Sequence, residues 1–184
     1  MIKTAGDLKI EVKTVEYASW VNKIGVVSDT HIPTRGRFLP PQLFKIFDGV
    51  QLILHAGDLV DEKIIDELNC LAPVEAVAGN MDPAYLRKRL GRLKLIKVGD
   101  LNIGLLHGDG GGRMIDPAQI CDLFKPVILQ AVVFGHLHEP QRIVHEGILF
   151  FNPGSAADPR RSPKPSCGRL LIKGSQIDGE IFYL

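Results

Sequence analysis

The chain has only three cysteines, Cys70, Cys121 and Cys167, and no two of them form a CxxC pair. An odd number of widely separated cysteines argues against a disulfide framework, and the missing pair argues against a cysteine-based zinc knuckle. No stretch approaches the ~20 apolar residues that a membrane span requires, and the N-terminus lacks both an apolar signal segment and a cleavage site of small residues. We therefore expect a reduced, soluble, cytoplasmic protein with no membrane partner.

An excess of charge is also missing, because 22 lysines and arginines stand against 21 aspartates and glutamates, which leaves a formal charge of +1. This balance excludes a long basic or acidic tail as the driver of binding, and nucleic acid is not indicated as a partner. Hydrophobic residues make up 45% of the chain and charged residues 23%, as in ordinary globular proteins. The length of 184 residues suits one domain with small appendages.

The first half of the chain predicts parallel strands that alternate with helices. Short apolar runs that end in polar residues are typical of buried strands, and they occur at 24–29, 51–58 and 74–80. Helix-like segments separate these runs, at 39–47 with prolines at the start and at 60–71 with acidic residues in the first turn. This order indicates an α/β layer with a parallel sheet.

The first 20 residues differ in character. Residues 8–12 alternate apolar and charged side chains, which predicts a half-exposed strand, although a loose arm fits equally well. We therefore divide the chain into an N-terminal extension at 1–22, an edge strand or an arm, and one domain at 23–184.

The second half favours antiparallel pairs. Apolar segments at 93–99 and 101–108 are joined by Gly99-Asp100, a hairpin signal, and Glu146-Gly147 marks another tight turn. A helix near 116–124, a strand at 131–136 and an antiparallel pair at the C-terminus complete the pattern. The predicted fold class is α/β, with two mixed sheets packed face to face and flanking helices outside.

Five short motifs fall at the ends of predicted strands. They are Asp29-Thr30-His31, Gly57-Asp58, Gly79-Asn80-Met81-Asp82, His107-Gly108 and Gly135-His136-Leu137-His138. The carboxyl ends of strands in open α/β sheets are where ligand sites form. Each motif alone is a weak signal, since Asp-x-His or Gly-Asp is usually a turn or a helix cap. Besides Asp82, however, they collect two aspartates, one asparagine and four of the six histidines, which favours a joint role.

The side chains in these motifs share a chemical preference. Imidazole, carboxylate and amide oxygen without thiolate suit divalent ions such as Mn, Fe, Co, Ni or Zn. Seven such ligands are too many for one catalytic zinc but suit two ions that share a bridging carboxylate. Two ions ~3.5–4 Å apart clamp the attacking and leaving oxygens in phosphoryl transfer. The set therefore suggests hydrolysis of phosphate esters.

In this order, the motifs resemble the signature of the calcineurin-like metallophosphoesterases. The likeness is greatest to the small single-domain bacterial and archaeal phosphodiesterases that are related to the retromer scaffold subunit. The resemblance runs from about Lys23 to the C-terminus and includes Asn152-Pro153-Gly154-Ser155. It implies a four-layer α/β/β/α sandwich, which agrees with the two predicted sheets. It also implies two divalent metal ions, with Mn as the expected ion and Zn, Fe, Ni or Co as alternatives.

Carried over to this chain, the resemblance gives each ligand a place. Asp29, His31 and His138 would hold the first ion, and Asn80, His107 and His136 the second, with Asp58 bridging the pair. Asp58, Asn80 and His107 would thereby be catalytic, and Asn80 would also contact the substrate. The implied mechanism is in-line attack of a metal-bridging hydroxide on phosphorus, without a covalent intermediate.

One position departs from the family pattern. Many larger members have a histidine where this chain has Met81, and that histidine is assigned to leaving-group protonation or phosphate binding. A thioether can do neither, so we expect weak turnover of poor leaving groups and better turnover of activated diesters. Asp82 is expected to orient its loop by hydrogen bonding. Of the other histidines, His55 is expected to be structural and His145 to lie on the surface.

Basic residues follow two of the motifs. Arg160, Arg161 and Lys164 lie in a proline-rich loop, for which a solvated surface loop is slightly favoured. The functional alternative is a cationic rim in which Arg160 and Arg161 bind the substrate's phosphate, since arginine binds phosphate through a planar fork. Arg35 and Arg37, just after His31, raise the same question.

The leading prediction is a dinuclear metal-dependent phosphodiesterase that acts on a small phosphate ester. Two rivals stay open: a phosphomonoesterase, including a phosphoprotein phosphatase, and a non-catalytic metal-binding scaffold for protein partners. All seven ligand positions are retained, which favours the enzyme over the scaffold. A homodimer is expected from the habit of the family.

Overall fold

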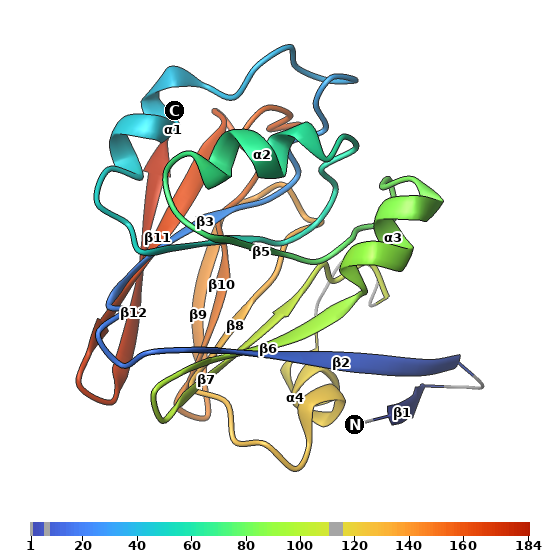
Figure 1. Cartoon of the computed structure of the whole chain (residues 1–184), viewed down its shortest axis with the longest axis vertical. Coiled ribbons are helices and arrows are strands. Elements are labelled where there is room, and N and C mark those ends of the chain that lie inside the picture. Colours follow the sequence, from blue (N-terminus) through green and yellow to red (C-terminus); the bar gives the residue numbers. More distant parts are fainter. Residues whose placement is uncertain (1, 6–7, 111–115) are drawn as a thin grey trace.

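Two β-sheets packed face to face, with helices on their outer sides, make up the computed structural model, which describes residues 2–5, 8–110 and 116–184 (Figure 1). The larger sheet has the strand order β1-β2-β6-β7-β8-β10-β9. In that order its strands are Ile2–Ala5, Leu8–Tyr17, Leu93–Val98, Leu101–Leu106, Ala131–Val133, Ile148–Asn152 and Gln141–His145.

The smaller sheet has five strands in the order β12-β11-β3-β4-β5. They are Gln176–Tyr183, Ser166–Lys173, Lys23–Val27, Leu52–His55 and Val74–Ala76. Both sheets are mixed: β3, β4 and β5 are parallel while β11 runs antiparallel to β3, and β8 lies parallel to both β7 and β10 while β6 and β7 are antiparallel. The four helices of the described residues are Pro41–Ile46 (α1), Lys63–Asn69 (α2), Ala84–Leu90 (α3) and Pro117–Phe124 (α4).

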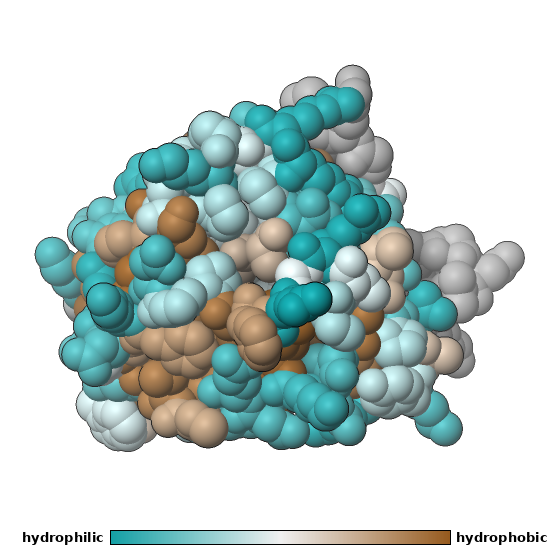
Figure 2. Space-filling model, turned by 90° about the horizontal axis from the view of Figure 1, so that it is seen from above, coloured by the Kyte–Doolittle hydropathy of each residue, from teal (hydrophilic) through white to brown (hydrophobic). Residues whose placement is uncertain are grey.

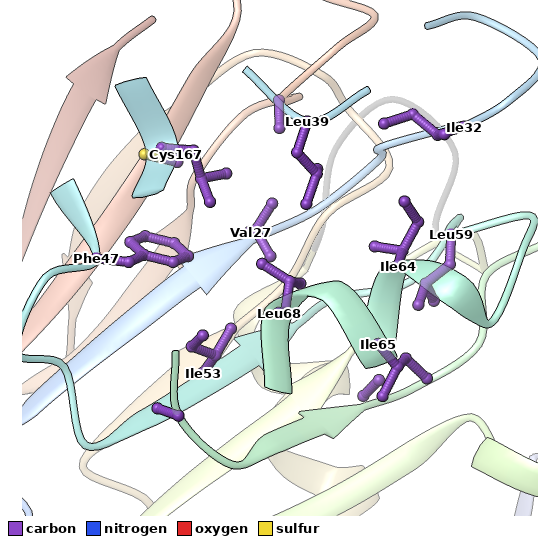
Figure 3. Packing of buried hydrophobic residues seen from close by; sticks show 14 of the residues in the cluster. Val27, Ile32, Leu39, Phe47, Ile53, Leu59, Ile64, Ile65, Leu68 and Cys167 are labelled. Carbon is purple, nitrogen blue, oxygen red and sulfur yellow. The ribbon is translucent and has the colours of Figure 1, made fainter. Parts of the chain in front are cut away.

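Three hydrophobic clusters hold these layers together. The strands of the smaller sheet alternate, so that Val26 faces the other sheet while Val27 faces the helices, where Phe47 and Leu68 pack with it (Figure 3). A third cluster joins the larger sheet to α4 through Phe124. The order helix, sheet, sheet, helix confirms the predicted α/β/β/α architecture.

The helices over the smaller sheet are short and do not cover it completely. Seen from the end that carries α1 and α2, the surface has hydrophobic side chains gathered in patches among hydrophilic ones (Figure 2). Phe44 of α1 and Phe182 of β12 are only partly buried where they pack against the cluster between this sheet and its helices. None of the helices in the described part of the chain is long and apolar enough to cross a membrane.

The segment from residue 8 forms a strand rather than a loose arm. From Val12 to Tyr17, β2 pairs in parallel register with β6, and β1 pairs with β2 at the edge of the sheet. The division of the chain at residue 22 stays a prediction.

The three strands predicted in the first half are shorter than expected. They end at Val27, His55 and Ala76 rather than at residues 29, 58 and 80, because the chain turns sharply where the motifs begin. Asp29 and Asp58 have φ angles of 52° and 57°, which no strand can contain. The motifs therefore lie just beyond the strand ends.

Candidate metal centre

The predicted ligands meet at the ends of β3, β4, β5, β7 and β8, where segments distant in sequence come together. Asp29, His31 and His138 form one group, buried throughout, whose ligand atoms all lie within 4.8 Å of one another. The Nε2 atoms of the two histidines are 3.3 Å apart, and Nε2 of His138 lies 3.2 Å from Oδ1 of Asp29. The three residues expected on the first ion are thus adjacent.

A second group, Asp29, Asp58 and His107, overlaps the first. Oδ2 of Asp58 lies 3.3 Å from Nε2 of His107 and 3.6 Å from Nε2 of His31, so this oxygen stands between the two groups. Asp29 belongs to both groups, although the resemblance assigns it to the first ion alone.

Asn80 and His136 lie beside the second group. Oδ1 of Asn80 is 3.2 Å from Nε2 of His107. The His136 ring contacts the His107 ring edge to face, with 5.2 Å between centroids, but His136 belongs to neither group. The structure therefore brings together the polar atoms of six of the seven predicted ligands, and the seventh, His136, lies against the ring of His107.

The ligand atoms are arranged to suit divalent cations, as their hydrogen bonds show. The carbonyl oxygen of Ala56 accepts from Nδ1 of His107 at 2.7 Å, and that of Asp158 accepts from Nδ1 of His138. These contacts turn Nε2 of each ring toward the carboxylates, which is how metal-binding imidazoles are oriented. Oδ1 of Asp29 is buried and has no hydrogen-bond partner among the described residues. A buried carboxylate oxygen without a hydrogen-bond partner is costly, and a cation bound there would remove that cost.

Backbone strain is concentrated at the same residues. Among the described non-glycine residues, eight have a positive φ, and five of these are predicted ligands: Asp29, His31, Asp58, His136 and His138. This left-handed region is costly for residues with a side chain, and it persists at functional sites where the surroundings enforce it. Hydrogen bonds enforce it here, since the amides of Asp29 and His31 donate to the carbonyls of Gly57 and Asp58, each at 3.0 Å.

Two glycines make room for the carboxylates. A Cβ at Gly79 would lie 2.0 Å from Oδ1 of Asp58, and one at Gly135 would lie 2.7 Å from Oδ2 of Asp29. Only glycine permits the backbone to approach the carboxylates this closely.

Comparison with known proteins supplies the family. Residues 23–175 match the model of the calcineurin-like phosphoesterase superfamily domain. The chain belongs to the calcineurin-like phosphoesterase superfamily. A relative from Methanothermobacter thermautotrophicus, named "Probable metallophosphoesterase", is 41% identical over 158 residues, which cover 86% of this chain and 90% of the relative.

Solved structures share the fold at lower identity. Vps29 from Chaetomium thermophilum is 20% identical, with a TM-score of 0.71, over 88% of this chain and 96% of that one. Vps29 from Entamoeba histolytica, solved in complex with Zn²⁺, is 24% identical, with a TM-score of 0.70, over 88% of this chain and 98% of that one.

In this calcineurin-like phosphoesterase, Asp82 organises the loops that carry the ligands. Its carboxylate accepts from the backbone amides of Asp58 at 2.9 Å, Gly79 at 2.7 Å and Val60 at 2.7 Å. The prediction that Asp82 orients its loop by hydrogen bonding is confirmed.

His55 lies beneath the centre and is structural, as expected, while His145 is exposed. The amide of Gly57 donates to Nδ1 of His55 at 3.2 Å, which leaves Nε2–H to donate to Oγ1 of Thr30 at 3.2 Å. His55 therefore ties together the two loops that carry Asp29 and Asp58.

Replacing His55 is expected to change how stability depends on pH. Burial lowers the pKa of His55 to about 3 from an ordinary value of 6.5, so the unfolded chain binds a proton there that the folded one rejects. Stability is therefore lost as pH falls below about 6.5, by up to about 1.4 kcal/mol per pH unit. In urea unfolding of metal-free protein, His55→Asn should flatten this acid dependence and His145→Asn should keep it. Equal slopes in the wild type and His55→Asn would contradict the assignment.

Electrostatics in the centre favour charged carboxylates. Burial alone would raise the pKa of Asp29, but the imidazoles of His138 and His31 outweigh it and hold this pKa well below its usual range. Burial likewise opposes ionisation of Asp58, yet its hydrogen bond with His107 and the charge there lower its pKa. Burial and the charge of His107 lower the pKa of His136. Both carboxylates are thus available as anionic ligands at neutral pH.

Of the two arginines predicted to bind the substrate's phosphate, only Arg160 is linked to the metal centre. Nε of Arg160 lies 3.4 Å from Oδ2 of Asp158, the residue whose carbonyl orients His138. Arg161 is exposed and makes no side-chain hydrogen bond or ion pair with a described residue. Sequence reasoning missed Asp158, since no motif marks a residue that acts through its carbonyl oxygen.

Proposed function

We propose that this chain is a dinuclear metal-dependent phosphoesterase that hydrolyses phosphodiesters. The observation that carries the proposal is the pair of overlapping ligand groups around Asp29 and Asp58, with the unpartnered Oδ1 of Asp29 facing Nε2 of His138 and of His31. Two ions sharing carboxylates are the arrangement that phosphoryl transfer exploits. Membership of the superfamily supports phosphoester hydrolysis as the reaction class.

Manganese is the ion we propose, because the ligands mix imidazole with carboxylate and amide oxygen. When bound, two such ions supply Lewis acidity, which activates water and offsets charge on the phosphoryl oxygens. Zinc is the first alternative to test, since a neighbour with this fold was solved in complex with Zn²⁺.

The residues of the chain hold and orient these parts. Asp58 presents Oδ2 to both groups, while its Oδ1 accepts from the amide of Met81 at 2.8 Å and cannot rotate away. Ala56 fixes the His107 ring so that Nε2 points inward. Asn80 is exposed, and with Oδ1 directed at His107 its amide nitrogen is free to donate to a phosphoryl oxygen of the substrate.

The test compares bis-p-nitrophenyl phosphate with the p-nitrophenyl monoester. Protein stripped of metal and reloaded with Mn, Zn, Co, Ni or Fe should cleave the diester faster than the monoester, and chelation should abolish both activities. A faster monoester would favour the phosphomonoesterase. Stoichiometric metal binding without turnover of either ester would favour the scaffold.

The turnover rate should depend strongly on the leaving group of the diester. Met81 is 56% exposed beside the centre and carries no proton to give, so an alkoxide must leave unassisted. Aryl diesters are therefore expected to turn over far faster than alkyl diesters. Met81→His should raise the alkyl rate about 100-fold, the lower end of general acid catalysis, and leave the aryl rate nearly unchanged. Equal wild-type rates on matched aryl and alkyl diesters would contradict this prediction.

A further inference from the structure

Two arginines extend from the first ligand group toward solvent. Arg160 and Arg35 both place Nε near Oδ2 of Asp158, at 3.4 and 4.0 Å, and their side chains are 49% and 67% exposed. Asp158 itself is largely covered, with 19% of its side chain exposed. The cluster carries two positive charges and one negative charge, so it keeps an excess of one positive charge.

Asp158 joins this cluster to the metal centre. Its carbonyl oxygen accepts from Nδ1 of His138, and its Oδ2 lies 3.9 Å from the same nitrogen. The backbone of Asp158 is held in place as well, because its amide donates to Oγ of Ser155 at 2.8 Å. The guanidinium groups are therefore separated from Nε2 of His138 only by the imidazole ring and one carboxylate.

Arg35 is attached to the other histidine of the same group. Its amide donates to the carbonyl of His31 at 2.8 Å, and Oγ1 of Thr34 donates to that carbonyl at 2.8 Å. The loop of Arg35 also packs on the loop of Arg160, since a Cβ at Gly36 would lie 3.2 Å from Cβ of Ala157. Both arginines thus stand on the same side of the centre.

The conformation of Arg160 is itself unusual. Its φ of 48° lies in the left-handed region, as do those of five predicted metal ligands. The turn in which Arg160 lies holds this conformation, since the amide of Ser162 donates to the carbonyl of Pro159 at 2.8 Å. The hydrogen bond of Arg160 to Asp158 is made by Nε, and the Nη atoms of Arg35 and Arg160 make no hydrogen bond with any described residue. Each guanidinium can therefore still bind a phosphoryl group.

We propose that Arg35 and Arg160 form an anion-binding pair that takes a second phosphoryl group of the substrate, so that the substrates are small phosphodiesters bearing a further phosphate. The proposal rests on the proposed function for the meaning of the site, but the anion-binding pair exists without turnover. A nucleic-acid tract would need more positive charge than two arginines and a chain charge of +1 supply.

Binding of two nucleotides tests the pair without relying on catalysis. Adenosine 3′,5′-bisphosphate carries a second phosphate that adenosine 5′-monophosphate lacks, and calorimetry can measure both on manganese-loaded and on metal-free protein. The wild type should prefer the bisphosphate by about tenfold or more, which corresponds to about 1.4 kcal/mol. Arg35→Gln and Arg160→Gln should each reduce that preference severalfold, and the double variant should abolish it.

Arg37→Gln is the matched control, because Arg37 is an exposed arginine two residues from Arg35. It should keep the wild-type preference, and thermal melting should show all variants folded. Equal wild-type affinity for the two nucleotides, or an equal loss in Arg37→Gln, would overturn the proposal. If the preference behaves as expected while no ester is cleaved with any ion, the proposed function fails and the anion-binding pair stands.

Discussion

Asp58→Asn is expected to lose at least about a thousandfold of the metal-dependent kcat/KM for bis-p-nitrophenyl phosphate, a cost of about 4 kcal/mol in transition-state stabilisation. Oδ2 of Asp58 faces Nε2 of both His31 and His107, and we expect it to join the two proposed ions. The asparagine substitutes a neutral amide for this anionic oxygen. Metal stoichiometry, measured by calorimetry beside the kinetics, should fall from two ions to one or fewer.

The substitution is designed to spare the fold. The amide oxygen of an asparagine can still accept from the backbone amide of Met81, as Oδ1 of Asp58 does at 2.8 Å. Asp48→Asn is the matched control, because Asp48 is exposed and its carboxylate makes no hydrogen bond or ion pair with a described residue. It should keep wild-type activity and metal content. Retention of a tenth or more of the activity in Asp58→Asn would show that Asp58 does not bridge two ions.

The sequence was sufficient to predict which residues meet, because each motif follows a strand and the carboxyl ends of neighbouring strands meet at one edge of a sheet. The sequence pattern overestimated the length of the strands. Val77 and Ala78 are fully buried and continue an apolar run, yet they lie beyond β5. The amide of Ala78 donates to the carbonyl of Gly91 and not to a strand. Hydrophobicity reports burial, and a buried loop has the same signature as a strand.

Contacts made through the backbone could not be predicted. Asp158 orients His138 with its carbonyl oxygen, which any residue type could provide. The Arg35–Asp158 contact spans more than a hundred residues and follows only from the packing of two loops.

Helix α3, in contrast, could have been predicted. Pro83 precedes it, Leu86 and Leu90 are spaced four residues apart, and Gly91 ends it with a φ of 75°.

Metal affinity is expected to rise with pH up to about 9, because His107 carries a proton in the metal-free protein. Burial alone would lower the pKa of His107, but its hydrogen bond with Asp58 and the negative charges of Asp29 and Asp58 outweigh burial and raise this pKa to about 9. The atoms facing its nitrogens suit an imidazolium, since the carbonyl of Ala56 and the side-chain oxygens of Asp58 and Asn80 are all acceptors. A metal ion needs the lone pair of Nε2 and must displace this proton.

The size of the effect follows from that displacement. A raised pKa means that protons stabilise the metal-free form throughout the range below about 9, so each lower pH unit weakens metal binding about tenfold, or about 1.4 kcal/mol. Calorimetric titration with Mn²⁺ should therefore show about a 100-fold gain in affinity between about pH 6.5 and about pH 8.5. An NMR titration of the metal-free protein should place the pKa of His107 near 9, with His136, whose pKa is lowered, as the internal comparison. Manganese affinity that stays constant over this range, together with a His107 that titrates below about pH 7, would show that the carboxylates do not hold that proton.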